Sequence, residues 1–351
     1  MKAVLGLENG EYVIGEGFGA EGSCAGELVF TTQMSGYMEA LTDPSYAGQI
    51  LMFTYPLIGN YGVDPQNFQS PKVNAMGCVV HELCRYPSSG MSLQSFFEQN
   101  NLLGISGVDT RKLTVDTRIT GTLRAALIAG DDNGEYAVEC ARALKPISDI
   151  DLLNQVSCKK PFRIPGKGKR IAVIDLGIKK NIAVSLRKRD ADLYIYPYNS
   201  KPSDLMACDP EAIFITNGPG DPACATDAVE CAKYFIGRIP VFGICMGNQV
   251  LGRAFGADTY KMKFGHRGSN QPVRHFDGSI YITTQNHGFA VDGNTLPEDC
   301  KIFFSNVNDG TLEGFCSEDL DVFCVQFHPE AHGGPLDTEK PIFDMMYRRI
   351  C

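Results

Sequence analysis

Residues 241–250 read VFGICMGNQV, and this stretch decides the fold of the C-terminal half of the chain. An apolar run leads into it, and a helix-like run, Gln249–Phe255, leaves it. Cys245 lies between Gly243 and Gly247, the spacing of a sharp strand-to-helix turn that holds a nucleophile in a strained conformation. The pattern predicts either a reactive thiol at the end of a strand or a buried cysteine in a glycine-tight turn.

The sequence on both sides of this stretch alternates between strand-like and helix-like runs. We expect a helix cap at Asp227, with Glu230 in the capping-box position. Alternation of this kind predicts βαβ units and a doubly wound, mainly parallel sheet. Ligands of such sheets bind at the carboxyl ends of the strands, so residues just after strand ends are candidate site residues. The expected strands are 171–175, 193–196, 212–216, 241–243 and 322–327, and the expected helices are 181–189, 228–236 and 249–255.

The first half of the chain has a different pattern of short strand-like runs separated by glycine-containing turns. It predicts an α+β domain with a mostly β core. A segment with two prolines, two glycines and six basic residues, SCKKPFRIPGKGKR (157–170), marks the seam between the halves. We therefore expect a two-domain chain with an N-terminal domain over 1–156, a linker over 157–169 and an α/β domain over 170–351. The expected first-half strands are 3–7, 12–17, 27–32, 49–55 and 77–81, and the expected helices are 92–100 and 109–118.

Composition excludes several function classes. The net charge of −9 argues against nucleic-acid binding, and no apolar stretch approaches the 18 residues of a membrane span. The 13 cysteines are odd in number and irregular in spacing, which favours free thiols in the cytoplasm over disulfides. None of the six histidines belongs to a sequence motif for zinc, so no metal is expected.

The segment NGPGDP (217–222) directly follows the predicted strand 212–216. Its glycines, Gly218 and Gly220, flank a proline, so the loop can present backbone amides to an anion or an oxyanion. A tight turn without a function is the alternative interpretation.

A histidine and a carboxylate follow the last predicted strand, as His328-Pro329-Glu330. A histidine at a strand end can act as base to Cys245, and Glu330 can orient its ring. The helix after Cys245 would favour the thiolate, and the Met246 amide would be an oxyanion donor. A Cys-His-Glu triad is the preferred hypothesis. His332 is a weaker rival base because it lacks a fixed orienting group.

Another strand-like run ends in Asn286-His287-Gly288-Phe289, so these residues also face the predicted site. Asn286 and the backbone of Gly288 and Phe289 can bind a carboxylate or an amide. Spacing alone does not decide whether His287 competes with His328 for the role of base.

Together, NGPGDP, GICMGNQ, NHGF and HPE resemble, in this order, the motifs of the class I, triad-type glutamine amidotransferases. The resemblance implies hydrolysis of the side-chain amide of L-glutamine through a Cys245 thioester, with His328 as base and Glu330 as its orienting group. It also implies substrate contacts at the following residues: Ser45, Gly218, Gly220, Met246, Gln249, Asn286, Gly288 and Phe289. The family commonly has histidine where this chain has Asn248, and a different basal glutaminase rate follows if that position tunes the thiol.

The first half resembles the N-terminal domain of the small, glutamine-hydrolysing chains of carbamoyl phosphate synthetases. The resemblance rests on MSGYMEALTDPSYAGQILMFTYPLIGNYG (34–62) and GVDTRKLT (107–114). It implies delivery of ammonia to a large ATP-dependent chain that makes carbamoyl phosphate from bicarbonate for arginine or pyrimidine biosynthesis. The partners would form a heterodimer or a larger assembly of such pairs. ATP and Mg are expected on the large chain and no cofactor on this one, which has no Walker A motif.

Two other function classes use the same residues. A cysteine peptidase would share the triad, although NGPGDP and NHGF favour a small amide substrate. A non-catalytic scaffold would keep the fold alone, and the presence of Cys245, His328 and Glu330 argues against that class.

Overall fold

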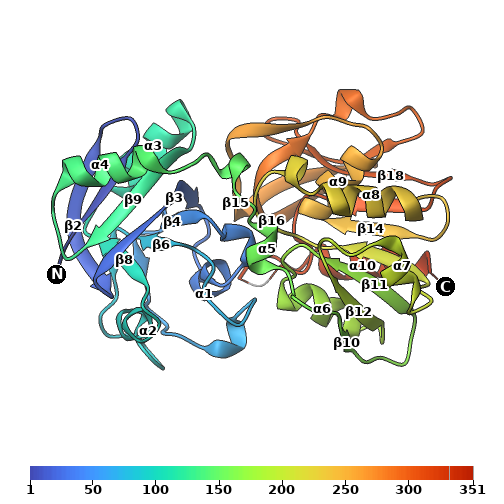
Figure 1. Cartoon of the computed structure of the whole chain (residues 1–351), viewed down its shortest axis with the longest axis horizontal. Helices are drawn as coiled ribbons and strands as arrows, with labels where there is room; N and C mark the ends of the chain where they lie inside the picture. The colour runs from blue at the N-terminus through green and yellow to red at the C-terminus, as the bar shows by residue number, and fades with distance from the viewer. Residues whose placement is uncertain (332, 351) are drawn as a thin grey trace. The chain divides into compact units, whose positions relative to one another are not determined.

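The computed structural model describes residues 1–331 and 333–350. The chain forms two compact units, Met1–Ile150 and a second unit that begins at Asp151 (Figure 1). The seam thus lies six residues before the boundary that the sequence predicted at 156. Part of the expected linker is a strand, β10 (Phe162–Ile164), which pairs antiparallel with β12 (Asp192–Pro197) of the second unit. No helix of the described residues is long and apolar enough to cross a bilayer.

A closed seven-stranded barrel forms the centre of the first unit, in the order β1-β2-β8-β6-β4-β3-β9. The sequence predicted strands here but not their closure. Closure follows because the first and last strands in this order pair with each other, which leaves the sheet without a free edge. The barrel strands are β1 (Lys2–Leu7), β2 (Tyr12–Gly19), β3 (Gly22–Thr31), β4 (Gln49–Phe53), β6 (Gly77–Val79), β8 (Leu103–Ser106) and β9 (Leu123–Ala129).

Short helices surround this barrel, and side chains cap most of them. Asp109 accepts a hydrogen bond from the Lys112 amide at the start of α3, and Ser92 accepts one from the Ser95 amide at the start of α2. The helices are α1 (Tyr37–Leu41), α2 (Leu93–Gln99), α3 (Thr110–Thr120) and α4 (Gly134–Ala143), with the 3-10 turns η1 (Pro44–Tyr46), η2 (Pro65–Asn67) and η3 (Ile147–Asp149); β5 (Leu57–Ile58) and β7 (Glu82–Leu83) form a separate pair.

A ten-stranded sheet forms the centre of the second unit, in the order β10-β12-β11-β13-β14-β19-β18-β17-β15-β16. Its middle strands run parallel, but the pairs from β19 through β16 are antiparallel. The prediction of a mainly parallel sheet is therefore wrong for this half, because parallel pairs need long crossovers and the strands here follow one another through short turns. The strands not yet bounded are β11 (Arg170–Asp175), β13 (Ala212–Ile215), β14 (Val241–Ile244), β15 (Thr259–His275), β16 (Ile280–Val291), β17 (Lys301–Asn306), β18 (Leu312–Ser317) and β19 (Val322–Val325).

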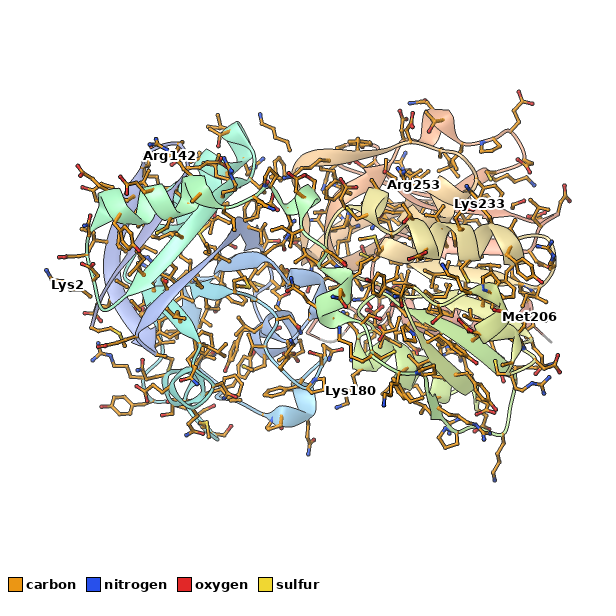
Figure 2. The ribbon with its side chains drawn as sticks, viewed as in Figure 1. Lys2, Arg142, Lys180, Met206, Lys233 and Arg253 are labelled. Carbon is orange, nitrogen blue, oxygen red and sulfur yellow. The ribbon has the colours of Figure 1, made fainter. Side chains whose placement is uncertain are left out.

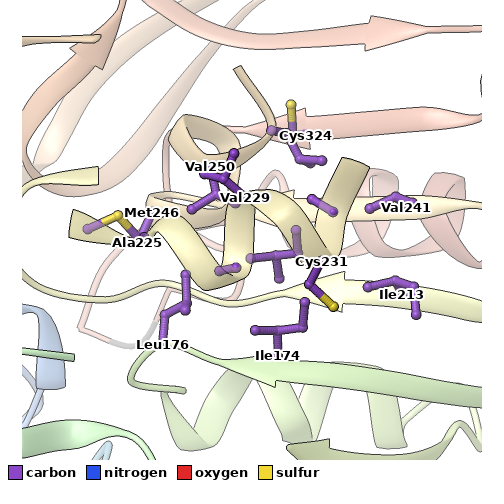
Figure 3. Close-up of a cluster of buried hydrophobic side chains, with 14 of the residues drawn as sticks. Ile174, Leu176, Ile213, Ala225, Val229, Cys231, Val241, Met246, Val250 and Cys324 are labelled. Carbon is purple, nitrogen blue, oxygen red and sulfur yellow. The ribbon is translucent and has the colours of Figure 1, made fainter. Parts of the chain in front are cut away.

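Helices cover both faces of this sheet. One face carries α6 (Lys180–Arg187) and α10 (Glu339–Arg348), and the other carries α7 (Pro202–Met206), α8 (Thr226–Phe235) and α9 (Met246–Ala254). Alternate strand residues pack on opposite faces, as the pleat requires. Figure 3 shows the face covered by α8 and α9, where Ile174, Ile213 and Val241 pack against these helices. Charged side chains on the outer side of the helices, such as Lys233 of α8, point to solvent (Figure 2). The remaining short elements are α5 (Leu153–Val156), η4 (Pro222–Cys224) and η5 (Gly293–Thr295).

The predicted cap of α8 is wrong. Helix α8 begins at Thr226 with Ala225 in the cap position, so Asp227 lies inside its first turn. There its carboxylate pairs with the Lys201 ammonium at 3.2 Å instead of accepting hydrogen bonds from backbone amides.

Candidate active site

Cys245 lies at a strained junction between β14 and α9. The strand ends at Ile244, the helix begins at Met246, and the cysteine between them has φ 56° and ψ −104°. A positive φ is costly for a residue with a Cβ and persists where packing enforces it, often at functional sites. The Cys245 amide donates to the Val325 carbonyl of β19 at 2.8 Å, which ties the turn to the sheet.

The two glycines around Cys245 are required by close backbone contacts. A Cβ on Gly247 would lie 2.2 Å from the Ile215 carbonyl oxygen of β13. A Cβ on Gly243 would lie 2.6 Å from the carbonyl group of Gly247 itself. The glycines therefore let the turn and the first residues of α9 pack directly on the neighbouring strand.

The predicted base and its orienting group are hydrogen-bonded and buried. His328 Nδ1 donates to Glu330 Oε1 at 2.7 Å, and the His328 amide donates to the Thr284 carbonyl of β16 at 2.8 Å. His328 Nε2 has no hydrogen-bond partner within the described part of the chain. Burial lowers the pKa of His328, but the Glu330 carboxylate and the Cys245 sulfur outweigh burial and raise this pKa. The ring therefore holds its proton more tightly than a free imidazole does.

Lys179 is a site residue that the sequence analysis missed. Its ammonium lies 2.9 Å from Glu330 Oε1, with 6% of the side chain exposed, and its amide donates to Asn217 Oδ1 at 3.1 Å. Burial raises the pKa of Glu330, but Lys179 and His328 together lower it to about 2. One signal could have found Lys179: it follows the end of strand β11, where site residues of such sheets gather.

The substrate residues predicted on α9 and β16 contact each other. Gln249 Nε2 donates to the Phe289 carbonyl at 2.8 Å and to Gln326 Oε1 at 3.0 Å. The Cys245 thiol faces the Asn286 carbonyl at 3.6 Å. Gln326, which precedes the HPE motif by two positions, is a further buried member of this network that the sequence analysis missed.

Asn248 is fully buried beside this network. Its Nδ2 donates to the same Gln326 Oε1 at 3.2 Å, and its Oδ1 has no partner among the described residues. The position where the family commonly has histidine thus shares an acceptor with Gln249.

The two glycines of the NGPGDP loop are required for different structural reasons. A Cβ on Gly218 would lie 2.3 Å from the Leu176 carbonyl oxygen, and Gly220 has φ +89°. Ser45 belongs to the first unit, in η1, where its amide donates to the Asp43 carboxylate at 2.9 Å. The other predicted site residues all lie in the second unit.

Two other histidines, His287 and His332, were considered as alternatives to His328 for the role of base. His287 Nδ1 lies 2.9 Å from the Phe289 carbonyl, and its Nε2 lies 3.1 Å from Gln285 Oε1. Both nitrogens therefore face other groups, which favours His328 as the base. His332 lies outside the described residues.

One group of described side chains has the chemistry of metal ligands. His266, His287 and Glu313 are buried, and their donor atoms lie within 4.8 Å of one another. His287 belongs to the NHGF segment, His266 to β15 and Glu313 to β18, and none of them was predicted as a metal ligand.

Comparisons with known proteins agree with this geometry. Residues 172–348 match the family model for glutamine amidotransferase class-I, and residues 5–127 match that for the carbamoyl-phosphate synthase small chain, CPSase domain. The carbamoyl phosphate synthase small chain of Methanosarcina acetivorans is 53% identical over 98% of this chain and 97% of its own length. That of Archaeoglobus fulgidus is 47% identical over 96% of each chain.

Among solved structures, a glutamine amidotransferase from Thermotoga maritima aligns with 52% of this chain and 96% of its own, at a TM-score of 0.42 and 15% identity. The family models and the near-full-length relatives agree on one assignment. This chain belongs to the carbamoyl phosphate synthase small chains and carries a class I glutamine amidotransferase domain.

Proposed function

We propose that this chain hydrolyses the side-chain amide of L-glutamine and supplies the ammonia to a large synthetase chain. The observation that carries the proposal is the strained Cys245 at the start of α9, close enough to His328 to raise the pKa of that ring, whose Nδ1 is fixed by Glu330. A thiol, a base and an orienting carboxylate together perform acyl transfer from amides.

In the proposed reaction the Cys245 sulfur attacks the amide carbon of the glutamine side chain. The amides of Met246 and Gly220 stabilise the oxyanion, and His328 Nε2 gives its proton to the departing ammonia. This step leaves a γ-glutamyl thioester on Cys245. His328 then takes a proton from water, which attacks the thioester and releases glutamate and the free thiol.

Further residues of the same proposal bind the substrate rather than react with it. Gln249 is held by Phe289 and Gln326, and therefore presents its side-chain carbonyl in a defined direction. The substrate contacts that complete the proposal are Ser45, Gly218, Gly220, Asn286, Gly288 and Phe289.

The proposed partner is a large chain that binds ATP and Mg and uses the ammonia with bicarbonate to form carbamoyl phosphate. We propose a heterodimer or a larger assembly of such pairs, with no cofactor on the small chain. A cytoplasmic location belongs to the same proposal, because the reaction needs a reduced Cys245.

The direct test measures ammonia release from free L-glutamine by the wild-type chain with its large partner. Cys245→Ser is expected to reduce the rate to background and to abolish labelling by a diazo-ketone analogue of glutamine. Cys224→Ser is the control, because Cys224 is an exposed cysteine outside the site. Full activity and labelling of Cys245→Ser, or cleavage of peptides in place of glutamine, would contradict the proposal.

A further inference from the structure

A buried histidine behind the glutamine site is held between two carboxylates. His266 Nε2 lies 2.9 Å from Asp309 Oδ2, and its Nδ1 lies 3.1 Å from Glu313 Oε1. The His266 side chain is 7% exposed, and Glu313 is completely buried on β18. Asp309 lies in the turn between β17 and β18, so this one ring joins β15 to that turn and to β18.

The two contacts hold the ring from both sides. Burial lowers the pKa of His266, but Glu313 and Asp309 outweigh burial and raise it. Burial raises the pKa of Glu313, and the hydrogen bond with His266 opposes that rise. Asn306 Nδ2 lies 3.3 Å from both Glu313 Oε1 and His266 Nδ1, so four polar side chains pack together here.

The histidine is coupled to the site through the neighbouring strand. His266 is the direct cross-strand partner of His287, and the two rings meet edge to face at 5.0 Å. His287 Nδ1 donates to the Phe289 carbonyl at 2.9 Å. The same carbonyl accepts Gln249 Nε2 at 2.8 Å. A displacement of the His266 ring would therefore reach Gln249 through two intermediate residues.

We propose that His266, held between Asp309 and Glu313, is a positioning residue that fixes His287 and the Phe289 carbonyl for glutamine binding. The proposal rests on the proposed glutaminase function. It adds a requirement for one buried side chain that contacts neither the substrate nor Cys245.

The first experiment is steady-state kinetics on the complex of this chain with its large partner. His266→Asn is expected to raise KM for glutamine about tenfold, the loss of one charged hydrogen-bonded contact, while kcat changes less than about twofold. Alkylation of Cys245 by iodoacetamide, which does not need Gln249, is expected to stay at the wild-type rate. His275→Asn is the matched control, since His275 is on the same strand and pairs with Asp277 at 2.8 Å.

The second experiment keeps the ring and removes one of the groups that hold it. Glu313→Gln keeps the size of the side chain but removes the carboxylate that His266 Nδ1 faces at 3.1 Å. KM for glutamine is expected to rise as in His266→Asn, while kcat changes less than about twofold.

Two results would overturn the proposal. One is an unchanged KM in His266→Asn while the wild type hydrolyses glutamine. The other is a stoichiometric zinc ion that is bound by wild type and lost in His266→Asn, because a metal at His266, His287 and Glu313 would then hold the ring. A wild-type chain that releases no ammonia would refute the proposed function instead.

Discussion

Lys179 Nζ lies 2.9 Å from Glu330 Oε1, the same carboxylate oxygen that accepts the hydrogen bond from His328 at 2.7 Å. Both contacts are buried, so Glu330 has two cationic neighbours and little solvent. Removal of one partner of a buried ion pair is costly because the other charge stays desolvated.

Lys179→Met is therefore expected to destabilise the chain by about 3–5 kcal/mol and to lower kcat of glutamine hydrolysis. Chemical denaturation and ammonia release measure the two effects. Lys188→Met is the control, because Lys188 is exposed and lies 3.7 Å from Glu339. It is expected to cost less than about 1 kcal/mol. Equal losses of stability in the two variants would show that the buried Lys179–Glu330 contact stabilises the chain no more than an exposed ion pair.

Glu330→Gln is expected to change the pH dependence of stability. The pKa of Glu330 is lowered in the folded chain from 4.5 to about 2, so its stabilising effect is complete above pH 4.5 and is lost as pH falls through 2. The stability difference between wild type and variant should be on the order of 3 kcal/mol at pH 6 and should shrink towards pH 2. Urea denaturation at several pH values measures it. A difference that stays constant with pH would contradict the ionised Glu330.

Gly247→Ala is expected to displace the turn at Cys245, because the added Cβ would lie 2.2 Å from the Ile215 carbonyl oxygen. We expect a loss of about 1–3 kcal/mol in stability and a large decrease in diazo-ketone labelling of Cys245. Gly256→Ala is the matched control after the end of α9, where φ is +85° and no atom lies within 4 Å. It should cost about 1 kcal/mol from backbone strain and leave labelling intact.

Gln326→Met is expected to raise KM for glutamine about tenfold, because it removes the acceptor that orients Gln249. Steady-state ammonia release gives KM and kcat separately. Asn248→Ala tests the other donor to the same Gln326 oxygen. It should change KM much less, since Gln249 then keeps both of its acceptors. A larger effect for Asn248→Ala would show that Asn248 acts on the site directly.

The sequence indicated most of the local structure around Cys245 and His328. Glycine at 243 and 247 around Cys245, and a carboxylate two residues after His328, are local patterns, and each has a short-range physical reason in the structure. The parallel pairing of β14 with β13 and β19 also followed from the alternation of strands and helices. The roles of Ser45 and of the NGPGDP and NHGF segments in binding glutamine stay predictions.

What the sequence missed depends on pairing between distant segments. The seven strands of the first unit close into a barrel only because β1 pairs with β9, more than 100 residues away. The antiparallel half of the second sheet depends on short turns between its strands. A pattern of apolar residues does not distinguish a strand that pairs antiparallel from one that pairs parallel.

By itself, the sequence determined the glycine-flanked turn at Cys245, the pairing of His328 with Glu330 and the parallel centre of the sheet, because these depend on neighbours within a few residues. Only the tertiary structure decided that Lys179 bonds to Glu330, that Gln326 links Asn248 to Gln249, and that His266 lies between Asp309 and Glu313. Those contacts join different strands and loops of the sheet. Their strength comes from burial, which no local pattern of residue types records.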